Sequence, residues 1–309
     1  AFSDALKASR EKADAEEAAA PARTLWSDAW KRLKKNKLAV IGAVWIIFVV
    51  LVALTADLWA PQLLGSPTDI DTTTVAQSSK LPPSPEHPFG TDATGRDQLV
   101  RVIYGSRVSL TVGVIATLIS TGIGLVMGAL AAFYGGWFDT IIMRLADMFL
   151  AIPYTLFVIT MLAVMGQGIQ NVFIAIGVLG WPSIARVFRS AILSVKENDY
   201  VDAARAMGAS DLRIIARHIF PNSVASIVVY ATMNIGGAIL TESALSYLGM
   251  GVTPPTPSWG IMIQDGQTFL QTQPWLMIMP GLAILSTVLA FTLLGDGLRD
   301  ALDVKMKDA

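Results

Sequence analysis

Cysteine is absent from the 309-residue chain, and charged residues make up only 15% of it. Without cysteine the chain has no disulfide bond, no thiol nucleophile and no cysteine-ligated metal. A net charge of −1 supplies no basic field for nucleic acid. The two histidines, His87 and His218, are far apart in sequence, so we expect no metal site. A soluble domain carries about 25% charged residues. The shortage of charge, beside 53% hydrophobic residues, therefore indicates a membrane protein.

Five long windows contain no Asp, Glu, Lys or Arg: 38–56, 108–138, 148–185, 219–241 and 266–295. A spanning helix needs about 20 apolar residues to cross about 30 Å of hydrocarbon. The third window is long enough to cross and turn back at its turn-prone run 166–171. The sequence therefore predicts an all-α membrane protein with six transmembrane helices, over 38–57, 107–134, 145–165, 171–190, 222–247 and 275–297. A soluble core with buried helices, the alternative, does not use so many long windows of this kind.

The distribution of positive charge predicts the orientation. Nineteen of the 23 Lys and Arg residues lie on the side of the six predicted helices that carries the N-terminus. The other four all lie between the first and second helices: Lys80, Arg96, Arg101 and Arg107. The positive-inside rule then places the N- and C-termini in the cytoplasm. The basic cluster at 31–37 anchors this orientation, and binding of anionic lipid heads is its alternative use.

Outside the spans, residues 1–23 are expected to form a cytoplasmic tail. The segment 24–37 has Trp26, Trp30 and Leu33 at helical spacing, which predicts an amphipathic helix with these three on one face. Prolines keep most of the outer loop 58–106 non-helical, with a short surface helix at 95–105. A second outer segment, 249–275, is rich in proline.

Small residues and a few charges inside or near the spans are candidates for packing or function. Gly124 and Gly128 form a GxxxG pair, for which we favour packing within one subunit over a partner interface. Glu242, at the outer end of the fifth predicted helix, is the ionisable group closest to mid-membrane, and it either has a functional role or caps a helix or reaches the membrane surface. Three charged residues are expected in a solvated inner turn: Asp139, Arg144 and Asp147.

The chain carries no source of driving energy for transport. No lysine follows a glycine, which excludes a Walker A loop, and no buried charges form an ion relay. No nucleophile–base pair or metal set converges on one depth, so nothing predicts an enzyme or a cofactor. If the chain transports a solute, we expect another protein to supply the driving energy. The alternative is a self-sufficient secondary carrier or channel.

The largest charged insert between spans, 186–218, predicts a helix, a bend and a second helix. Asn198 or Asp199 can cap the first helix, and Gly208 permits a positive φ at the bend. Ser210 or Asp211 can cap the second helix, which Pro221 ends or kinks. Two short helices joined by a bend at the membrane surface are suited to contact another protein.

This insert resembles the EAA loop of ABC-transporter permeases, E-A-A-x-x-x-G followed later by I-x-L-P. Here the pattern stands as Asp202-Ala203-Ala204-x-x-x-Gly208 and then Ile219-Phe220-Pro221. Asp replaces Glu at position 202, and the second half is similar to the dipeptide/oligopeptide/nickel branch. Further segments resemble the same branch, at 89–97, 107–110, 245–252 and 254–260. Together, in order, they are similar to the C-type permease of a peptide importer.

The resemblance implies the type I ABC importer permease fold in a bacterial or archaeal plasma (inner) membrane. It implies as partners a second homologous permease in a heterodimer, two ABC ATPase subunits that hydrolyse ATP, and an extracytoplasmic substrate-binding protein. The substrate implied is a dipeptide or oligopeptide, with nickel, glutathione or another small solute as alternatives. It assigns ATPase coupling to six residues: Asp202, Ala203, Ala204, Arg205, Gly208 and Ala209. We expect Arg205, Arg213 and Arg217 to bind either the partner or lipid heads, and we favour a structural role for His218 over metal binding.

The expected domain organisation follows. Residues 1–37 form the cytoplasmic tail with its basic amphipathic segment, 38–57 the first transmembrane helix, and 58–106 the extracytoplasmic loop. Residues 107–304 form the type-1 transmembrane domain of five helices, with the coupling loop at about 198–218. For Arg96 and Asp97 we favour a role in loop structure over docking of the binding protein.

Overall fold

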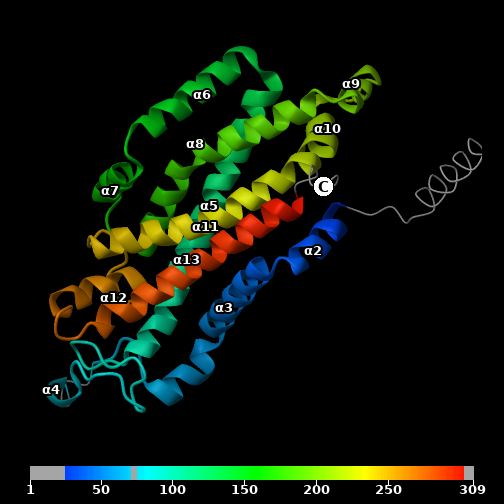
Figure 1. Cartoon of the computed structure of the whole chain (residues 1–309). Helices are drawn as coiled ribbons and strands as arrows, with labels where there is room; N and C mark the ends of the chain where they lie inside the picture. The colour runs from blue at the N-terminus through cyan, green and yellow to red at the C-terminus, as the bar shows by residue number, and fades with distance from the viewer. Residues whose placement is uncertain (1–24, 71–74, 303–309) are drawn as a thin grey trace, which may run out of the picture.

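The computed structural model of the chain describes residues 25–70 and 75–302 (Figure 1). The predicted tail at 1–23 lies outside the described residues. Within the described part the first helices are α2 (Leu25–Lys35), α3 (Lys37–Leu64), α4 (Val75–Ser78), α5 (Gln98–Tyr134), α6 (Gly136–Ala151), α7 (Tyr154–Met165) and α8 (Ile169–Lys196). They are followed by α9 (Asp199–Ala206), α10 (Asp211–Ile214), the π-helix η1 (Ile215–Ile219), α11 (Phe220–Tyr247), α12 (Trp259–Gly266), the 3-10 turn η2 (Gln267–Phe269) and α13 (Trp275–Leu302).

Five helices are long and apolar enough to cross a membrane: α3, α5, α8, α11 and α13. The predicted third span, 145–165, is not one straight helix. Helices α6 and α7 pass the same test only as a pair, and they are bent by 88° between Ala151 and Tyr154. Pro153 is the cause, because it disfavours helical backbone at Ile152, whose φ and ψ are −91° and 132°. A bent pair of helices, with the length and composition of either a broken span or a re-entrant loop, therefore replaces the predicted straight span.

Helix α5 starts nine residues before the predicted 107, at Gln98, and runs to Tyr134. The expected surface helix at 95–105 is therefore its first turns and not a separate element. Asp97 begins α5, because its carboxylate accepts the backbone N–H of Val100 at 3.0 Å. Helix α3 likewise continues past the predicted 57 to Leu64, so the outer loop is shorter than predicted.

Glycines let α5 lie directly on α8. A Cβ on Gly128 would stand 2.7 Å from the carbonyl oxygen of Ala185, and a Cβ on Gly124 2.7 Å from Ile184. Gly177 of α8 meets Ile119 in the same way. The GxxxG pair therefore serves packing within the subunit, as predicted. Lipid supplies no hydrophobic drive between helices, so close backbone approach holds this pair together.

Helix α2 is the predicted amphipathic helix, although its buried face differs from the prediction. Ala29 and Leu33 are buried against the end of α13, near Leu298 and Ala301, whereas Trp30 is exposed. Residues four apart share a helix face, and Trp30 lies about 100° around the axis from Ala29. The side chain of Trp26 lies outside the described part.

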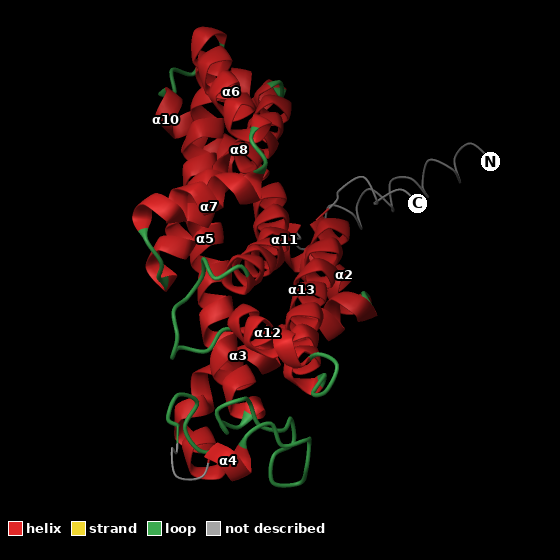
Figure 2. Cartoon of the chain, turned by 90° about the vertical axis from the view of Figure 1, so that its left-hand side faces the viewer, coloured by secondary structure: helices red, strands yellow, loops and turns green. Residues whose placement is uncertain are grey.

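The elements divide between two ends of the molecule. Figure 1 shows α9, α10, α2 and the end of α13 toward one end, and α12 with α4 toward the other. Figure 2 shows the longest loops gathered at the end that carries α4.

Candidate functional site

The knob, residues 199–209, consists of α9 and the glycine turn that ends it. Gly208 has φ +79°, which a residue with a Cβ adopts at a cost. The Ala209 N–H donates to the Ala204 carbonyl at 3.1 Å, and the Gly208 N–H donates to the Arg205 carbonyl at 3.0 Å. These two bonds form a Schellman motif, which satisfies the last carbonyls of the helix. The predicted helix and glycine bend are confirmed.

The knob has a buried face and an exposed face. Val201 and Ala204 are buried in a cluster with Phe188, Ile192 and Ile214. This contact packs α9 on α10 and on the end of α8 that the sequence predicts to be cytoplasmic. The side of α9 that faces away carries exposed side chains of mixed chemistry: Asp202, Ala203, Arg205 and Met207.

The six residues predicted to couple to an ATPase occupy different places on the knob. Asp202, Ala203, Arg205 and Gly208 are exposed, and Ala209 is half-buried. Asp202 and Arg205 form an ion pair, with Oδ1 and Nη1 3.3 Å apart. Ala204 is only 4% exposed, so its methyl group contacts its own chain and not an outside surface. The structure adds Met207, 83% exposed, which the sequence did not single out.

A helical connection joins the knob to a spanning helix. Helix α10 runs into η1 and then α11 without a loop, and the Phe220 N–H donates to the Ile215 carbonyl across the π turn. Pro221 lacks an N–H and its ring clashes in a regular helix interior. The wider π turn accommodates it, as π-bulges do. Pro221 therefore does not end the helix, and α10, η1 and α11 follow one another without a loop.

The predicted solvated inner turn is instead part of α6, and its carboxylates pair with α8. Asp139 accepts two hydrogen bonds from Arg189, at 2.5 and 2.6 Å. Asp147 accepts a single hydrogen bond, from Nη2 of Arg186. The sequence could not predict these partners, because they lie about 40 to 50 residues away. Arg144 stays exposed beside Asp147.

Glu242, the candidate near mid-membrane, is fully buried. Its carboxylate accepts hydrogen bonds from the hydroxyls of Ser109 at 2.9 Å and Ser246 at 2.7 Å, with Ser243 at 3.4 Å. Ser246 lies one helical turn from Glu242, so spacing could have indicated that contact. Ser109 is on α5, and only the packing of α5 on α11 brings it there. Glu242 neither caps a helix nor reaches the surface, and it ties two helices together.

The outer cluster, Asp92, Arg96, Arg101 and Asp265, joins the outer loop to α5 and α12. Asp92 pairs with Arg96 at 2.8 Å and with Arg101 at 3.1 Å, and Arg101 reaches Asp265 at 3.4 Å. Burial by itself raises the pKa of Asp92, but the charges of Arg101 and Arg96 and the hydrogen bonds from the Thr94 hydroxyl and the Arg96 backbone together hold that pKa below its usual value. Burial raises the pKa of Asp265.

The role of Arg96 and Asp97 in loop structure is confirmed by these contacts. Arg96 holds Asp92 within the loop, and Asp97 caps α5. The second carboxylate oxygen of Asp97 lies 2.8 Å from Nδ1 of His87. His87 therefore has a partner in the loop.

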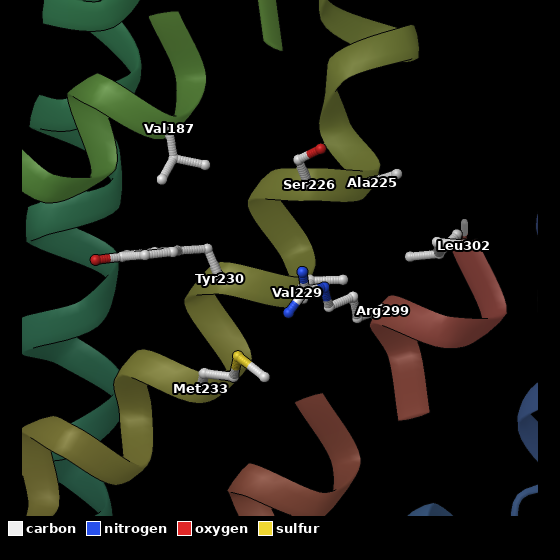
Figure 3. Close-up of a pocket in the computed structure, with 8 residues that line it drawn as sticks. All are labelled: Val187, Ala225, Ser226, Val229, Tyr230, Met233, Arg299 and Leu302. Atoms are coloured by element: carbon white, nitrogen blue, oxygen red, sulfur yellow. The ribbon is translucent and has the colours of Figure 1, made fainter. Parts of the chain in front are cut away.

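A pocket of about 530 Å³ opens between α8, α11 and α13. Figure 3 shows its lining: Val187 of α8, then Ala225, Ser226, Val229, Tyr230 and Met233 of α11, then Arg299 and Leu302 of α13. The lining is mostly apolar, and its guanidinium, from Arg299, can pair with the carboxylate of a small molecule, whereas the Tyr230 hydroxyl points to the opposite side (Figure 3). Sequence reasoning missed this pocket because three separate helices build it.

Two family models match the chain. Residues 123–308 match the model described as "Binding-protein-dependent transport system inner membrane component". Residues 24–83 match the "N-terminal TM domain of oligopeptide transport permease C".

Relatives and solved structures agree with these matches. The chain is 44% identical over 283 residues to the dipeptide transport system permease protein DppC of Alkalihalophilus pseudofirmus, covering 91% of this chain and 90% of that one. It is 42% identical over 285 residues to the glutathione transport system permease protein GsiD of Escherichia coli, covering 92% of each. A chain of the inward-facing MetNI methionine ABC transporter matches with a TM-score of 0.56 at 18% identity, covering 66% of this chain and 97% of that chain.

The structural match shows the fold, that of a type I ABC importer permease. The family matches show the function class: a multi-pass subunit of a bacterial inner membrane, which works with ATPase and binding-protein partners. It is not an enzyme, because ATP hydrolysis resides in the partner subunits. The chain belongs to the family of inner-membrane permease subunits of binding-protein-dependent ABC importers.

Proposed function

We propose that this permease imports short peptides, that it pairs with a second homologous permease around a shared pathway, and that two ATPases drive it through the knob. The two relatives described above are named for a dipeptide and for glutathione, which is itself a tripeptide. Both substrates carry free carboxylates and peptide bonds. The pocket beside Tyr230 fits this class, because its volume of about 530 Å³ and its guanidinium suit a small anion-bearing ligand.

One observation carries the coupling proposal: α9 exposes one face, while Val201 and Ala204 on its other face are packed in a buried apolar cluster. Asp202 and Arg205 offer both charges to a partner, and Met207 offers an adaptable apolar group. Ala203 and Gly208 permit close approach of a groove. Ala204 was expected to contact the ATPase, but it is buried and packs the knob against its own chain.

The coupling role is tested at Gly208. Gly208→Val places a β-branched residue at φ +79°, where even an unbranched residue costs about 1–2 kcal/mol. We expect ATP-driven uptake and substrate-stimulated ATPase activity of the assembled transporter to fall together, while insertion of the chain is unchanged. Gly208→Asn is the matched control, because asparagine tolerates this backbone region, and it should retain most of the uptake.

Full coupled uptake by the Gly208→Val transporter contradicts the docking role of the knob. A cross-link is the second measurement. Cysteine in place of Met207 should join to an ATPase subunit, whereas cysteine at the opposite-end position Thr256 should not.

The substrate and the assembly are tested by reconstitution. Vesicles that contain this chain, the second permease, the ATPases and the binding protein should accumulate labelled dipeptide with ATP. Unlabelled dipeptide should compete, and glutathione should compete less well. Faster uptake of glutathione than of the dipeptide would instead identify glutathione as the substrate. Uptake by this chain alone would support a self-sufficient carrier or channel.

A further inference from the structure

Helix α2 has one face packed on the chain and one face exposed. Ala29 and Leu33 are buried against the end of α13, near Leu298 and Ala301. The other face, together with the first residue of α3, carries an aromatic ring and four ammonium groups. We call this surface the basic face, and its residues are Trp30, Lys31, Lys34, Lys35 and Lys37, all exposed.

The charge of the basic face is not balanced within the described part of the chain. No carboxylate there forms an ion pair with Lys31, Lys34, Lys35 or Lys37. Asp28 is the acidic residue of α2, and it is half-buried. So dense a set of positive charges attracts anionic groups. We propose that the basic face binds the phosphate groups of anionic phospholipids in the leaflet where α3 enters the bilayer.

The place of the basic face in the chain sets its depth. The spanning helix α3 begins at Lys37. Leu38 and Ile41 are more than half exposed, so the apolar surface of the span starts within about one turn of Lys37. Lys31 lies at most about 9 Å farther along the helix. The polar layer on each side of the hydrocarbon is about 5–8 Å thick. The lysines are therefore within reach of the lipid headgroups.

Trp30 has the environment of an interfacial tryptophan. Its side chain is 59% exposed, and Nζ of Lys34 lies 5.1 Å from the centroid of its ring. Tryptophan gathers at membrane–water interfaces because its ring is apolar while its N–H can reach headgroups or water. A helix that exposes tryptophan and lysine together has the composition of a helix that lies in the headgroup region.

The ATPases have a different place in the assembly proposed above. They meet the exposed face of the knob on α9, whereas α2 packs on α13 and α3. Figures 1 and 2 both show α2 apart from α10, on the flank that α3 and α13 form. The basic face therefore lies outside the surface assigned to the ATPases.

Charge also disfavours a second permease as the occupant. Inner-membrane proteins carry an excess of Lys and Arg beside the cytoplasmic ends of their spans, where the sequence predicts the start of α3. Two such ends placed face to face would set like charges against each other. Anionic headgroups carry the opposite charge and attract lysines next to a span.

The test places a benzophenone amino acid at Trp30 of the assembled transporter, in vesicles of equal parts phosphatidylglycerol and phosphatidylcholine. After illumination, mass spectrometry compares the adducts of the two lipids. We expect phosphatidylglycerol adducts to exceed phosphatidylcholine adducts about tenfold. The same probe at Leu54, 72% exposed and about 25 Å along α3 from Lys37, reports bulk lipid and should give nearly equal adducts.

Removal of charge should remove the preference. Lys34→Gln with Lys35→Gln leaves Lys31 and Lys37 to hold the orientation of the chain, and the excess of phosphatidylglycerol should fall to about twofold. Lys34→Arg with Lys35→Arg is the matched control, because it keeps both charges and a similar helix propensity, and it should retain the excess. Salt at about 1 M should abolish the excess in the unsubstituted chain with the probe, a measurement that needs no charge variant.

Equal adducts of the two lipids at position 30 would overturn the proposal. An excess that survives both the glutamine variant and high salt would overturn it as well, because charge would then not be its cause. A cross-link from position 30 to an ATPase, to the second permease or to residues 1–24 of the chain would overturn it in favour of a protein occupant.

Discussion

Among single residues, the buried carboxylate of Glu242 contributes more to the packing of the helices than the exposed charged side chains do. It lies inside a spanning helix, and the described residues offer it hydroxyls and not a cation. Carboxylate oxygens accept several hydrogen bonds, so Ser109 and Ser246 together compensate for its removal from water. Because Ser109 is on α5, the network also sets how α5 and α11 meet.

We therefore predict that Glu242→Ala lowers the stability of the permease by about 2–4 kcal/mol, since it leaves two buried hydroxyls without their acceptor. Thermal unfolding in nanodiscs measures this. Glu242→Gln keeps one acceptor oxygen and should lose less. Asp202→Ala, at an exposed position, should leave the unfolding temperature within error. An unchanged transition for Glu242→Ala would show that the network contributes nothing.

At the scale of elements, glycine decides which helix faces lie in contact. Gly128 allows the backbone of α5 to reach Ala185 of α8. Gly122, nearly two turns earlier on the same helix, faces open space, because a Cβ added there would meet no neighbouring atom within 4 Å. Glycine costs helix propensity, so its benefit at 128 comes from close packing. The two positions form a natural comparison within one sequence.

We predict that Gly128→Leu destabilises the α5–α8 pair by about 1–3 kcal/mol or more, because the added side chain separates the helices. Gly122→Leu should have little effect. Both variants add the same side chain to the same span, so hydropathy and insertion are matched. Detergent-solubilised yield and thermal unfolding distinguish them, and equal behaviour would contradict the packing role of Gly128.

The ionised carboxylate of Asp92 holds the outer loop on helix α5, because it pairs with Arg96 of the loop and Arg101 of the helix. Burial opposes ionisation, but the charges of Arg101 and Arg96 and the hydrogen bonds to the carboxylate together lower its folded pKa, so the charged form favours the folded loop. The stability it contributes is present above the unfolded pKa of about 3.9 and is lost as pH falls through the folded value. Asp265 acts oppositely, because its folded pKa is raised and its protonation favours the folded state.

We predict that the loop around Asp92 becomes sensitive to an acid-active protease only below about pH 4. Limited proteolysis between pH 7 and pH 3 measures this. Asp92→Asn should make the loop sensitive at every pH, since Arg101 and Arg96 lose their shared partner. Onset of cleavage already near pH 6 would contradict control by this carboxylate.

At the scale of the whole molecule, the distribution of charge predicts which end faces the cytoplasm. The knob and the outer loop lie toward opposite ends of the molecule (Figure 1). Among the described residues, most Lys and Arg belong to segments that the sequence predicts on the side of the knob, and the positive-inside rule assigns that side to the cytoplasm. The absence of cysteine gives a clean background for labelling this arrangement.

We predict that cysteine in place of Thr256 reacts with an impermeant thiol reagent added outside intact cells. Cysteine in place of Met207 should react only after the membrane is opened. The two exposed sites serve as controls for each other. The reverse pattern would invert the topology of the chain.

Part of the fold was predictable because its cause is local. Burying a charge in hydrocarbon is costly for each residue by itself, so the charge-free windows locate the spans without any partner. The knob was predictable for the same reason, since Gly208 and the helix formers before it act over one or two turns. The break at Pro153 was visible in the sequence, but the prediction gave more weight to apolar length than to the proline.

Exclusion of charge and local backbone preference act along the chain, so the sequence was enough to predict a membrane permease, the places of most of its spans and the segment that forms the knob. Only the folded molecule reveals the 88° bend, the partners of Glu242 and Asp139, the buried side of Ala204 and the exposure of Trp30. Each of these depends on which distant helices lie in contact, and a contact free energy is not a property of either helix alone.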